Sequence, residues 1–212
     1  MLRVALGRGA VSLAVLLAFV VTLVGGFLHP GYSHAADYIS ELGAVGAANG
    51  PLVSVAGFVP IGILIIAGLA LIAPGVQARG MARFGYWLLL ANGVSYIGAA
   101  VAPCDLGCPA VGSGRQAMHN LLGLLGYGVS GLGLLLLAGQ AATGRSNRWI
   151  TVALRIAGIV ALGSPVLMGI PDLMPLRGLI QRIAECALFA ALLLIAWRVA
   201  AGPGQAPRQS GR

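Results

Sequence analysis

The chain's few ionisable side chains are concentrated in short segments between long apolar runs. It has three histidines and five carboxylates among 212 residues. The segment HPGYSHAADYISELGA, residues 29–44, holds two of each. At helical spacing, His34, Asp37 and Glu41 would lie on one face. A histidine beside carboxylates is a typical general acid–base group, because its pKa is near neutral.

Two interpretations of this segment are open. It is either a solvated loop whose polar side chains face water, or a structured cap that covers a site. Its aromatic and aliphatic residues favour the cap, because such side chains gain free energy by packing against an apolar surface. These residues are Tyr32, Tyr38, Ile39 and Leu42.

A second polar segment contains two cysteines. The motif PCDLGCP places Cys104 and Cys108 four residues apart, between two prolines. In an oxidising compartment, a disulfide that closes this tight loop is the expected state. The alternative is a thiolate zinc site completed by Asp105 and His119. Because Cys-x-x-x-Cys is not a usual ligand spacing, we predict no metal site.

One apolar run begins with RQAMHNLLGLLGYG, which carries His119 and, about two turns later, Tyr127. His119 either caps a contact between helices or belongs to a site. Tyr127 either packs this helix against polar residues of the preceding run or lines a ligand channel. The possible partners in the preceding run are Asn92, Ser95 and Tyr96.

Another apolar run begins with QRIAECALF, which contains Glu185, the only carboxylate inside such a run. An ionised carboxylate in hydrocarbon needs a partner. That partner is either Arg182, three residues earlier, or an inward group such as His119 or a ligand cation. Cys186 is expected to be a small buried apolar residue.

We expect the segment 29–44 to fold over the ends of the two runs that carry His119 and Glu185. It would bring His34 and Glu41 close to His119, with Glu185 below them.

These segments supply two sets of candidate site residues. The candidates for acid–base or catalytic roles are His34, Asp37, Glu41, Asp105, His119 and Glu185. The candidates for ligand binding, among which arginines would hold a phosphate, are Ser40, Arg115, Asn120, Tyr127, Asp172, Arg177 and Arg182. For Asp172, a simple turn role is an equal alternative. No G-x-S-x-G motif is present, which disfavours an ordinary serine hydrolase.

The composition indicates what must position these residues. The chain is 58% hydrophobic and 8% charged, whereas a soluble domain carries about 25% charged residues. It cannot cover itself with a polar surface and therefore belongs in a bilayer. The net charge of +8 comes entirely from arginines. They are scattered singly and form no basic patch, so nucleic acid is excluded as a partner.

Membrane-crossing helices need about 20 apolar residues each, and six runs qualify. They lie roughly at residues 10–28, 52–73, 84–102, 118–140, 149–170 and 179–200. We predict an all-α integral membrane bundle of six helices with a structured first outer loop. It would form one domain over residues 1–200, followed by a flexible tail over residues 201–212. The first run is longer than the 7–15-residue core of a signal peptide, so we expect it to remain as a span.

The arginine distribution predicts the orientation, because cytoplasmic loops are enriched in arginine. One face would carry only three arginines: Arg115, Arg177 and Arg182. Because it carries so few arginines, this face is the outer one, and the histidines and carboxylates all fall at or near it. Both termini would be cytoplasmic, with the protein in the inner (plasma) membrane. The cytoplasmic arginines would be Arg3, Arg8, Arg79, Arg83, Arg145, Arg148, Arg198, Arg208 and Arg212.

The motifs HPGYSHAADYISELGA, PCDLGCP and QAMHN, together with the Glu185 segment, resemble the bacterial six-span family called domain of unknown function 998 (DUF998). The resemblance covers nearly the whole chain and implies a six-helix membrane protein without an assigned activity. The stretch ISELG is also similar to Ile-Ser-Asp-Thr-Gly of the Frag/DRAM/Sfk six-span family. That family has a histidine entering span four and a glutamate in span six, which here correspond to His119 and Glu185. Its members handle lipids and glycolipid anchors.

Three classes of function follow. The leading hypothesis is a protein that binds or remodels a lipid or lipid-linked head group at its outer face, with membrane lipid as its partner. The second is a metal- or haem-binding protein with zinc or a bis-histidine haem, although the sequence requires no cofactor. The third is a small-solute transporter, which is disfavoured because the polar residues gather at one face.

Overall fold

The computed structural model describes residues 1–141 and 148–200, which form helices joined by short connections. Arg145, Arg208, Arg212 and the expected tail over residues 201–212 lie outside this description. The α-helices are α1 (Leu2–Leu28), α2 (Gly50–Leu52), α3 (Val59–Ile72), α4 (Gly80–Leu88), α5 (Leu90–Val101), α6 (Gly114–Ala141), α7 (Arg148–Met168) and α8 (Arg177–Leu194). The 3-10 helices are η1 (Ile39–Gly43), η3 (Ala73–Gly75) and η4 (Pro171–Leu176), and the π-helical segments are η2 (Val53–Phe58) and η5 (Ile195–Val199).

Six of these helical stretches are long and apolar enough to cross a membrane. Helices are the expected solution for apolar runs, since a helix satisfies every backbone hydrogen bond within its own segment. The prediction of an all-α six-span bundle is confirmed. The first helix begins at Leu2, eight residues before the expected span. The six stretches are Leu2–Leu28, Gly50–Gly75, Gly80–Val101, Gly114–Gly139, Arg148–Met168 and Pro171–Val199.

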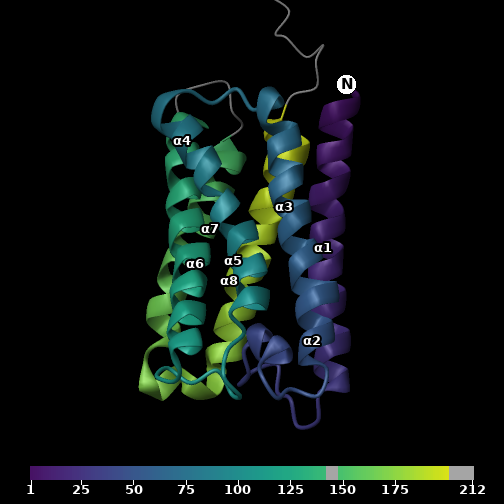
Figure 1. Cartoon of the computed structure of the whole chain (residues 1–212). Coiled ribbons are helices and arrows are strands. Elements are labelled where there is room, and N and C mark those ends of the chain that lie inside the picture. Colours follow the sequence, from purple (N-terminus) through teal and green to yellow (C-terminus); the bar gives the residue numbers. More distant parts are fainter. Residues whose placement is uncertain (142–147, 201–212) are drawn as a thin grey trace, which may run out of the picture.

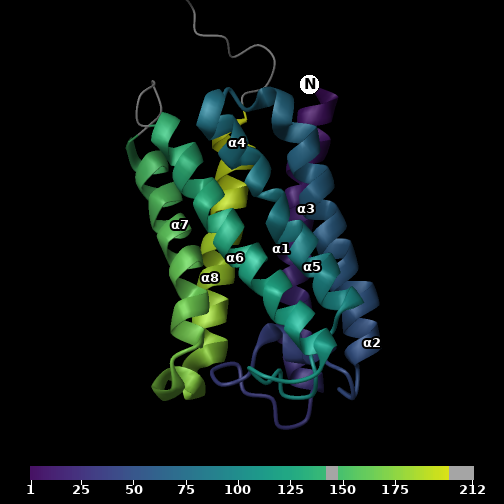
Figure 2. The same cartoon turned by 60° about the vertical axis from the view of Figure 1, so that its left-hand side comes forward.

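Consecutive spans run up and down beside one another (Figures 1 and 2). Helix α1 packs on α3, α3 on α5, α5 and α4 on α6, α6 on α7, and α7 on α8. We call the end at which α1 begins the N-terminal end. The opposite end, made by residues 29–49, 102–113 and 169–176, is called the loop end. Fully buried aliphatic side chains fill the interior, among them Ile61, Ile65, Leu69, Leu134, Leu154, Leu188, Leu192 and Ile195.

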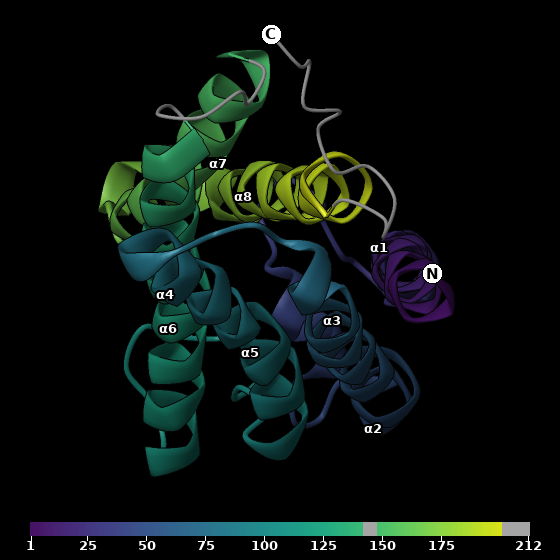
Figure 3. The ribbon, with the colours of Figure 1, turned by 90° about the horizontal axis from the view of Figure 1, so that it is seen from above.

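Helices α1 and α8 close the bundle at the N-terminal end. The Arg8 guanidinium donates to the carbonyl oxygens of Ala196 at 2.9 Å and Ala200 at 2.8 Å. Val76 pairs with Ala200 in an isolated antiparallel bridge beside this contact. The two helices then diverge toward the loop end, as Figures 1 and 3 show. The seam between the first and the last span is therefore tight at one end and open at the other.

The second span changes its helical winding just before Pro60. A proline has no backbone N–H and cannot donate to the carbonyl four residues earlier. Residues Val53–Phe58 form the π-helical segment η2 at this point. Such segments are frequent at functional sites, and Phe58 at the end of η2 lines the pocket described next.

Candidate functional site

Glu185 lies on α8 and points into the bundle, where its side chain is 8% exposed. The Tyr127 hydroxyl of α6 donates to Glu185 Oε1 at 2.7 Å, and the Tyr96 hydroxyl of α5 lies beside the same carboxyl group. Glu185 Oε2 has no hydrogen-bond partner among the described residues. Within that part of the chain, Arg182 forms no ion pair with Glu185. Glu185 therefore points inward, as one of the two interpretations expected, but its partner is the Tyr127 hydroxyl rather than His119 or a cation.

A pocket surrounds this carboxyl group at the loop end of the bundle. It contains about 450 Å³ of open space, including its mouth. Helices α5, α6 and α8 form its walls, and Ile39 and Ser40 of η1 cover it. The first loop is thus a structured cap rather than a solvated loop. The pocket is lined by Ile39, Ser40, Phe58, Ser95, Tyr96, Ala99, His119, Gly123, Tyr127, Gln181 and Glu185.

His119 enters the same pocket from α6. Its Nδ1 lies 2.9 Å from the carbonyl oxygen of Ala102. A carbonyl oxygen only accepts hydrogen bonds, so Nδ1 carries the proton and donates. The second ring nitrogen, Nε2, is then an acceptor in the neutral imidazole. His119 and Glu185 therefore offer a ligand two acceptor groups from different helices.

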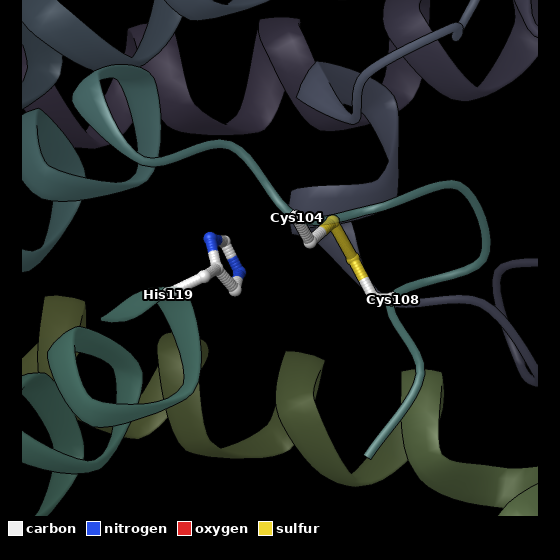
Figure 4. A group of neighbouring side chains, drawn as sticks. All are labelled: Cys104, Cys108 and His119. Atoms are coloured by element: carbon white, nitrogen blue, oxygen red, sulfur yellow. A yellow bond between two sulfur atoms is a disulfide. The ribbon is translucent and has the colours of Figure 1, made fainter. Parts of the chain in front are cut away.

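The disulfide loop borders the pocket beside His119. Cys104 and Cys108 are joined by a disulfide, and Figure 4 shows the outer edge of the His119 ring turned toward it. The two sulfurs and a His119 nitrogen all lie within 4.8 Å of one another. In the described part of the chain, no other group of three such ligands is close enough to hold a metal ion. A disulfide offers no thiolate, so the bonded form lacks the ligands that zinc prefers.

Arg177 fastens the first loop to α8. Its guanidinium donates to Glu41 Oε1 at 3.0 Å, to the Ala36 carbonyl at 2.9 Å and to the Gly107 carbonyl at 3.2 Å. Burial raises the pKa of Glu41, while the Tyr38 N–H and Arg177 oppose that shift. We expected Glu41 close to His119, and the structure instead pairs it with Arg177. Glu41 lies on the 3-10 helix η1, and its side chain contacts Arg177 in the first turn of α8 rather than a residue of α6.

Arg182 holds the same loop one turn further along α8. Its Nη1 donates to the carbonyl oxygens of Asp37 and Gly178, each at 2.9 Å, and its Nη2 donates to the Tyr32 hydroxyl. Gly178 permits this close approach, because a Cβ there would collide with the Asp37 and Ala35 carbonyls. Arg182 Nε is buried without a hydrogen-bond partner in the described residues.

The remaining first-loop candidates lie outside the pocket. The Ser33 N–H donates to Asp37 Oδ2 at 2.7 Å, so this carboxylate stabilises a turn. The His34 imidazole packs on Gly26 of α1 and meets the Tyr32 ring edge-on, with 5.2 Å between centroids. Partial desolvation and, after it, the charge of Arg182 lower the pKa of His34. Our expectation that His34 joins His119 is not met, because the cap folds toward α1 at this point.

A surface network at the start of α6 contains three other candidates. Asp105 accepts hydrogen bonds from the Ser113 N–H and hydroxyl, both at 2.8 Å, and from Arg115 at 3.0 Å. Asn120 donates to the Ala110 carbonyl at 3.0 Å. These contacts hold the 102–113 loop in place and do not enter the pocket. Asp172 is exposed at the start of η4 and also lies away from the pocket.

One expectation about a single residue is wrong. Cys186, expected to be buried, is exposed on the side of α8 that faces away from the bundle interior. Tyr127, for which packing against the preceding span and lining a channel were both open, lines the pocket and bonds to Glu185 on α8. Residue spacing indicates which residues share a helix face, but not which helix lies opposite that face.

One polar wall residue, Gln181, is not among the candidates predicted from the sequence. It is 9% exposed, and its Oε1 accepts a hydrogen bond from the Ile39 N–H at 2.6 Å. Gln181 therefore joins the cap directly to the pocket wall. The signal was available, because Gln181 lies four residues before Glu185 and so shares its helix face.

Comparison with known proteins gives a family but no activity. The family described as "Protein of unknown function (DUF998)" matches residues 12–198. Neither the curated proteins nor the solved structures contain a match to the chain. The matched segment includes most of the first span, nearly all of the last, the four spans between them, the cap, the disulfide loop and the pocket. The chain is therefore a multi-pass membrane protein that belongs to the DUF998 family.

Proposed function

We propose that this protein binds a lipid or lipid-linked head group in the pocket at its loop end, which faces the outer side of the membrane. The orientation rests on the arginine bias of the sequence. The ligand would meet Glu185, Tyr127 and Gln181 on one side and His119 on the other. His119 Nε2 would accept a hydrogen bond or a proton from a ligand hydroxyl, which is the role of a general base.

One observation carries the proposal: Glu185 Oε2 is buried at the pocket and has no partner. Leaving a buried acceptor unsatisfied costs about 1–3 kcal/mol, and more for a charged group. A polar or ionisable group at membrane depth is by default a functional one. A ligand that donates a hydrogen bond to Oε2 would recover this cost, which favours a head group with hydroxyl or amine donors.

A lipid suits this position better than a soluble ligand. The pocket lies between membrane-spanning helices and beneath the apolar residues of the cap, near the depth at which head groups meet hydrocarbon. The resemblance of ISELG, His119 and Glu185 to the Frag/DRAM/Sfk family, whose members handle lipids, agrees with this assignment. If the lipid is also remodelled, His119 is placed to act as the general base, and binding does not depend on that step.

The test compares the carboxylate at the site with one outside it. E185Q keeps the shape of the side chain and removes its charge, and the matched control D172N makes the same change at the exposed Asp172. Lipid that remains bound after extraction in mild detergent is measured by native mass spectrometry. We expect E185Q to lose about tenfold in lipid occupancy, the size of a charge-assisted hydrogen bond, and D172N to match the wild type. Equal occupancy in all three proteins contradicts the proposal.

A second candidate, transport of a small solute, is favoured by two further unpartnered atoms. Asn92 Oδ1 on α5 and Ser130 Oγ on α6 are buried without hydrogen-bond partners in the described chain, deeper than the pocket. These two atoms would bind a polar solute as it moves from the pocket toward the N-terminal end. Transport predicts that N92A impairs function as strongly as E185Q, whereas lipid binding predicts that N92A leaves lipid occupancy unchanged.

A further inference from the structure

A second pocket lies on the other side of Glu185, in the seam between α1 and α8. Together with its open mouth it spans about 300 Å³, and it shares Ile39, Tyr96 and Glu185 with the first pocket. These three side chains therefore form a common wall. The other walls are Ala18, Phe19 and Thr22 of α1 and Arg182, Cys186 and Phe189 of α8.

This seam pocket opens on the lipid-facing side of the bundle. Phe19 is 45% exposed and Cys186 is exposed. The lining residues of the pocket come from the loop-end half of α1 and the middle of α8, and the two helices diverge toward the loop end (Figure 3). In a membrane, acyl chains are the surrounding solvent at this surface. From Arg182 to Phe189 the pocket follows α8 for about 10 Å, at 1.5 Å per residue.

Two unpartnered polar atoms lie in the walls of the seam pocket. Arg182 Nε is a buried donor and Glu185 Oε2 is a buried acceptor, and neither has a partner among the described residues. Arg182 and Glu185 are three residues apart on α8, so they share one face. They would together match a ligand that carries both an anionic acceptor and a hydrogen-bond donor.

We infer that a phospholipid with a hydrogen-bond-donating head group enters this site sideways, through the seam between α1 and α8. One acyl chain occupies the seam pocket between Phe19 and Phe189. The phosphate accepts from Arg182 Nε, and the head group turns inward past Tyr96 so that its donor reaches Glu185 Oε2. The inference rests on the proposed function, and it adds the ligand class and the entrance.

Two lipids that differ in one feature test the head-group assignment. Phosphatidylethanolamine has N–H donors, whereas phosphatidylcholine has the same phosphate and a quaternary ammonium without N–H. In native mass spectrometry of the full chain with equal amounts of both lipids, the wild type should prefer phosphatidylethanolamine by about tenfold. E185Q should lose that preference. Equal binding of the two lipids by the wild type overturns the head-group assignment.

Two variants on α1 test the entrance. T22F places a large ring in the seam pocket, and V24F places the same ring on the same helix at a 50% exposed position outside the lining. We expect T22F to reduce phosphatidylethanolamine binding about tenfold, because its ring fills space that the acyl chain would occupy and overpacking is unfavourable. V24F should bind the lipid as the wild type does. Normal binding by T22F together with weak binding by E185Q overturns the seam entrance and leaves the proposed function standing. Normal binding by both T22F and E185Q overturns the seam entrance and the proposed function together.

The natural thiol of Cys186 provides a readout that needs no substitution. It lines the seam pocket and is exposed. Phosphatidylethanolamine bound in the seam should slow its reaction with N-ethylmaleimide, while glycerophosphoethanolamine, which has the same head group and no acyl chain, should not. Unchanged labelling with phosphatidylethanolamine would contradict the seam entrance even if T22F failed to fold.

Discussion

Glu185 and His119 illustrate what single residues reveal in so apolar a chain. Each is a rare polar group inside a hydrophobic run, so the sequence identifies both as site candidates. Their meeting at one pocket depends on α6 and α8 facing each other, which no spacing within either helix specifies. The same limit explains why the bond between Tyr127 and Glu185 could not be predicted, whereas Gln181 could have been found from its spacing to Glu185.

The first prediction concerns the coupling of these two residues. If His119 and Glu185 hold the same ligand, the site loses most of its affinity when either is removed. H119A and E185Q should therefore lower lipid occupancy by similar factors, and the double variant should be little worse than either, since groups that act as a unit are not additive. Native mass spectrometry of the three proteins measures this. Effects that multiply cleanly would show two independent sites.

The second prediction concerns Asp105. The Ser113 N–H and hydroxyl, with a smaller contribution from Arg115, hold the pKa of Asp105 below its usual value of 3.8. The unfolded chain lacks these bonds and takes up a proton at higher pH. The resulting stability is present above the unfolded pKa and is lost as the pH falls through the folded one. Between about pH 5 and 3, the thermal midpoint in detergent should fall more for the wild type than for D105N, and parallel curves would exclude this role.

At the scale of elements, the cap is held by the first turns of α8. Arg177, Gly178 and Arg182 all contact the segment from Ala35 to Glu41, although that segment is about 140 positions earlier in the chain. The sequence predicts that the first loop is structured, because it contains apolar residues able to dock. It does not identify α8 as the docking site, since arginines in an outer loop are equally suited to binding a phosphate.

The third prediction uses two glycines. G178A would push a methyl group against the Asp37 and Ala35 carbonyl oxygens and should destabilise the protein by about 1–3 kcal/mol, as overpacking does. G128A is the control, because nothing lies within 4 Å of a Cβ at this position of α6. In a helix interior, replacing glycine by alanine should stabilise by about 0.5–1 kcal/mol. Thermal unfolding in detergent should therefore shift in opposite directions, and equal shifts would contradict the close packing of α8 on the cap.

The fourth prediction concerns the disulfide loop. Cys104 and Cys108 are bonded, and Cys186 is the free thiol of the structure. Mass spectrometry of unreduced protein treated with iodoacetamide should find a single alkylated cysteine, Cys186. Alkylation should rise to three sites after reduction. If all three sites are labelled without reduction, the disulfide is absent, and zinc binding by Cys104, Cys108 and His119 becomes the interpretation to test.

For the whole molecule, hydropathy alone predicts the six spans and the all-α class, because the bilayer imposes both the length and the helical form of each run. It is less informative about where helices begin. Helix α1 extends to Leu2 and carries Arg3 and Arg8 inside its first turns, where the sequence suggested a flanking segment. Arg8 can lie within the helix because its long aliphatic stem packs against apolar surface. Its guanidinium donates hydrogen bonds to the carbonyl oxygens of Ala196 and Ala200 at the end of the last span.

The fifth prediction is the orientation of the bundle. The structure places both ends of the described chain at the same end of the bundle, and the arginine bias predicts that this end is cytoplasmic. A fluorescent protein that matures only in the cytoplasm should be bright when fused to the C-terminus. Alkaline phosphatase, which is active only outside the cytoplasm, should be inactive at the same position. The reverse result would place the pocket on the inner side and overturn the outer-leaflet assignment.

The seam between α1 and α8 also determines when the site can exist. The ribosome makes α1 first and α8 last, and the contact between Arg8 and Ala196 cannot form until nearly the whole chain has been synthesised. Until then the nascent bundle lacks Gln181, Arg182 and Glu185, and its cap lacks the hydrogen bonds that α8 supplies. A chain truncated before α8 therefore leaves Tyr96, His119 and Tyr127 without the helix that closes their pocket.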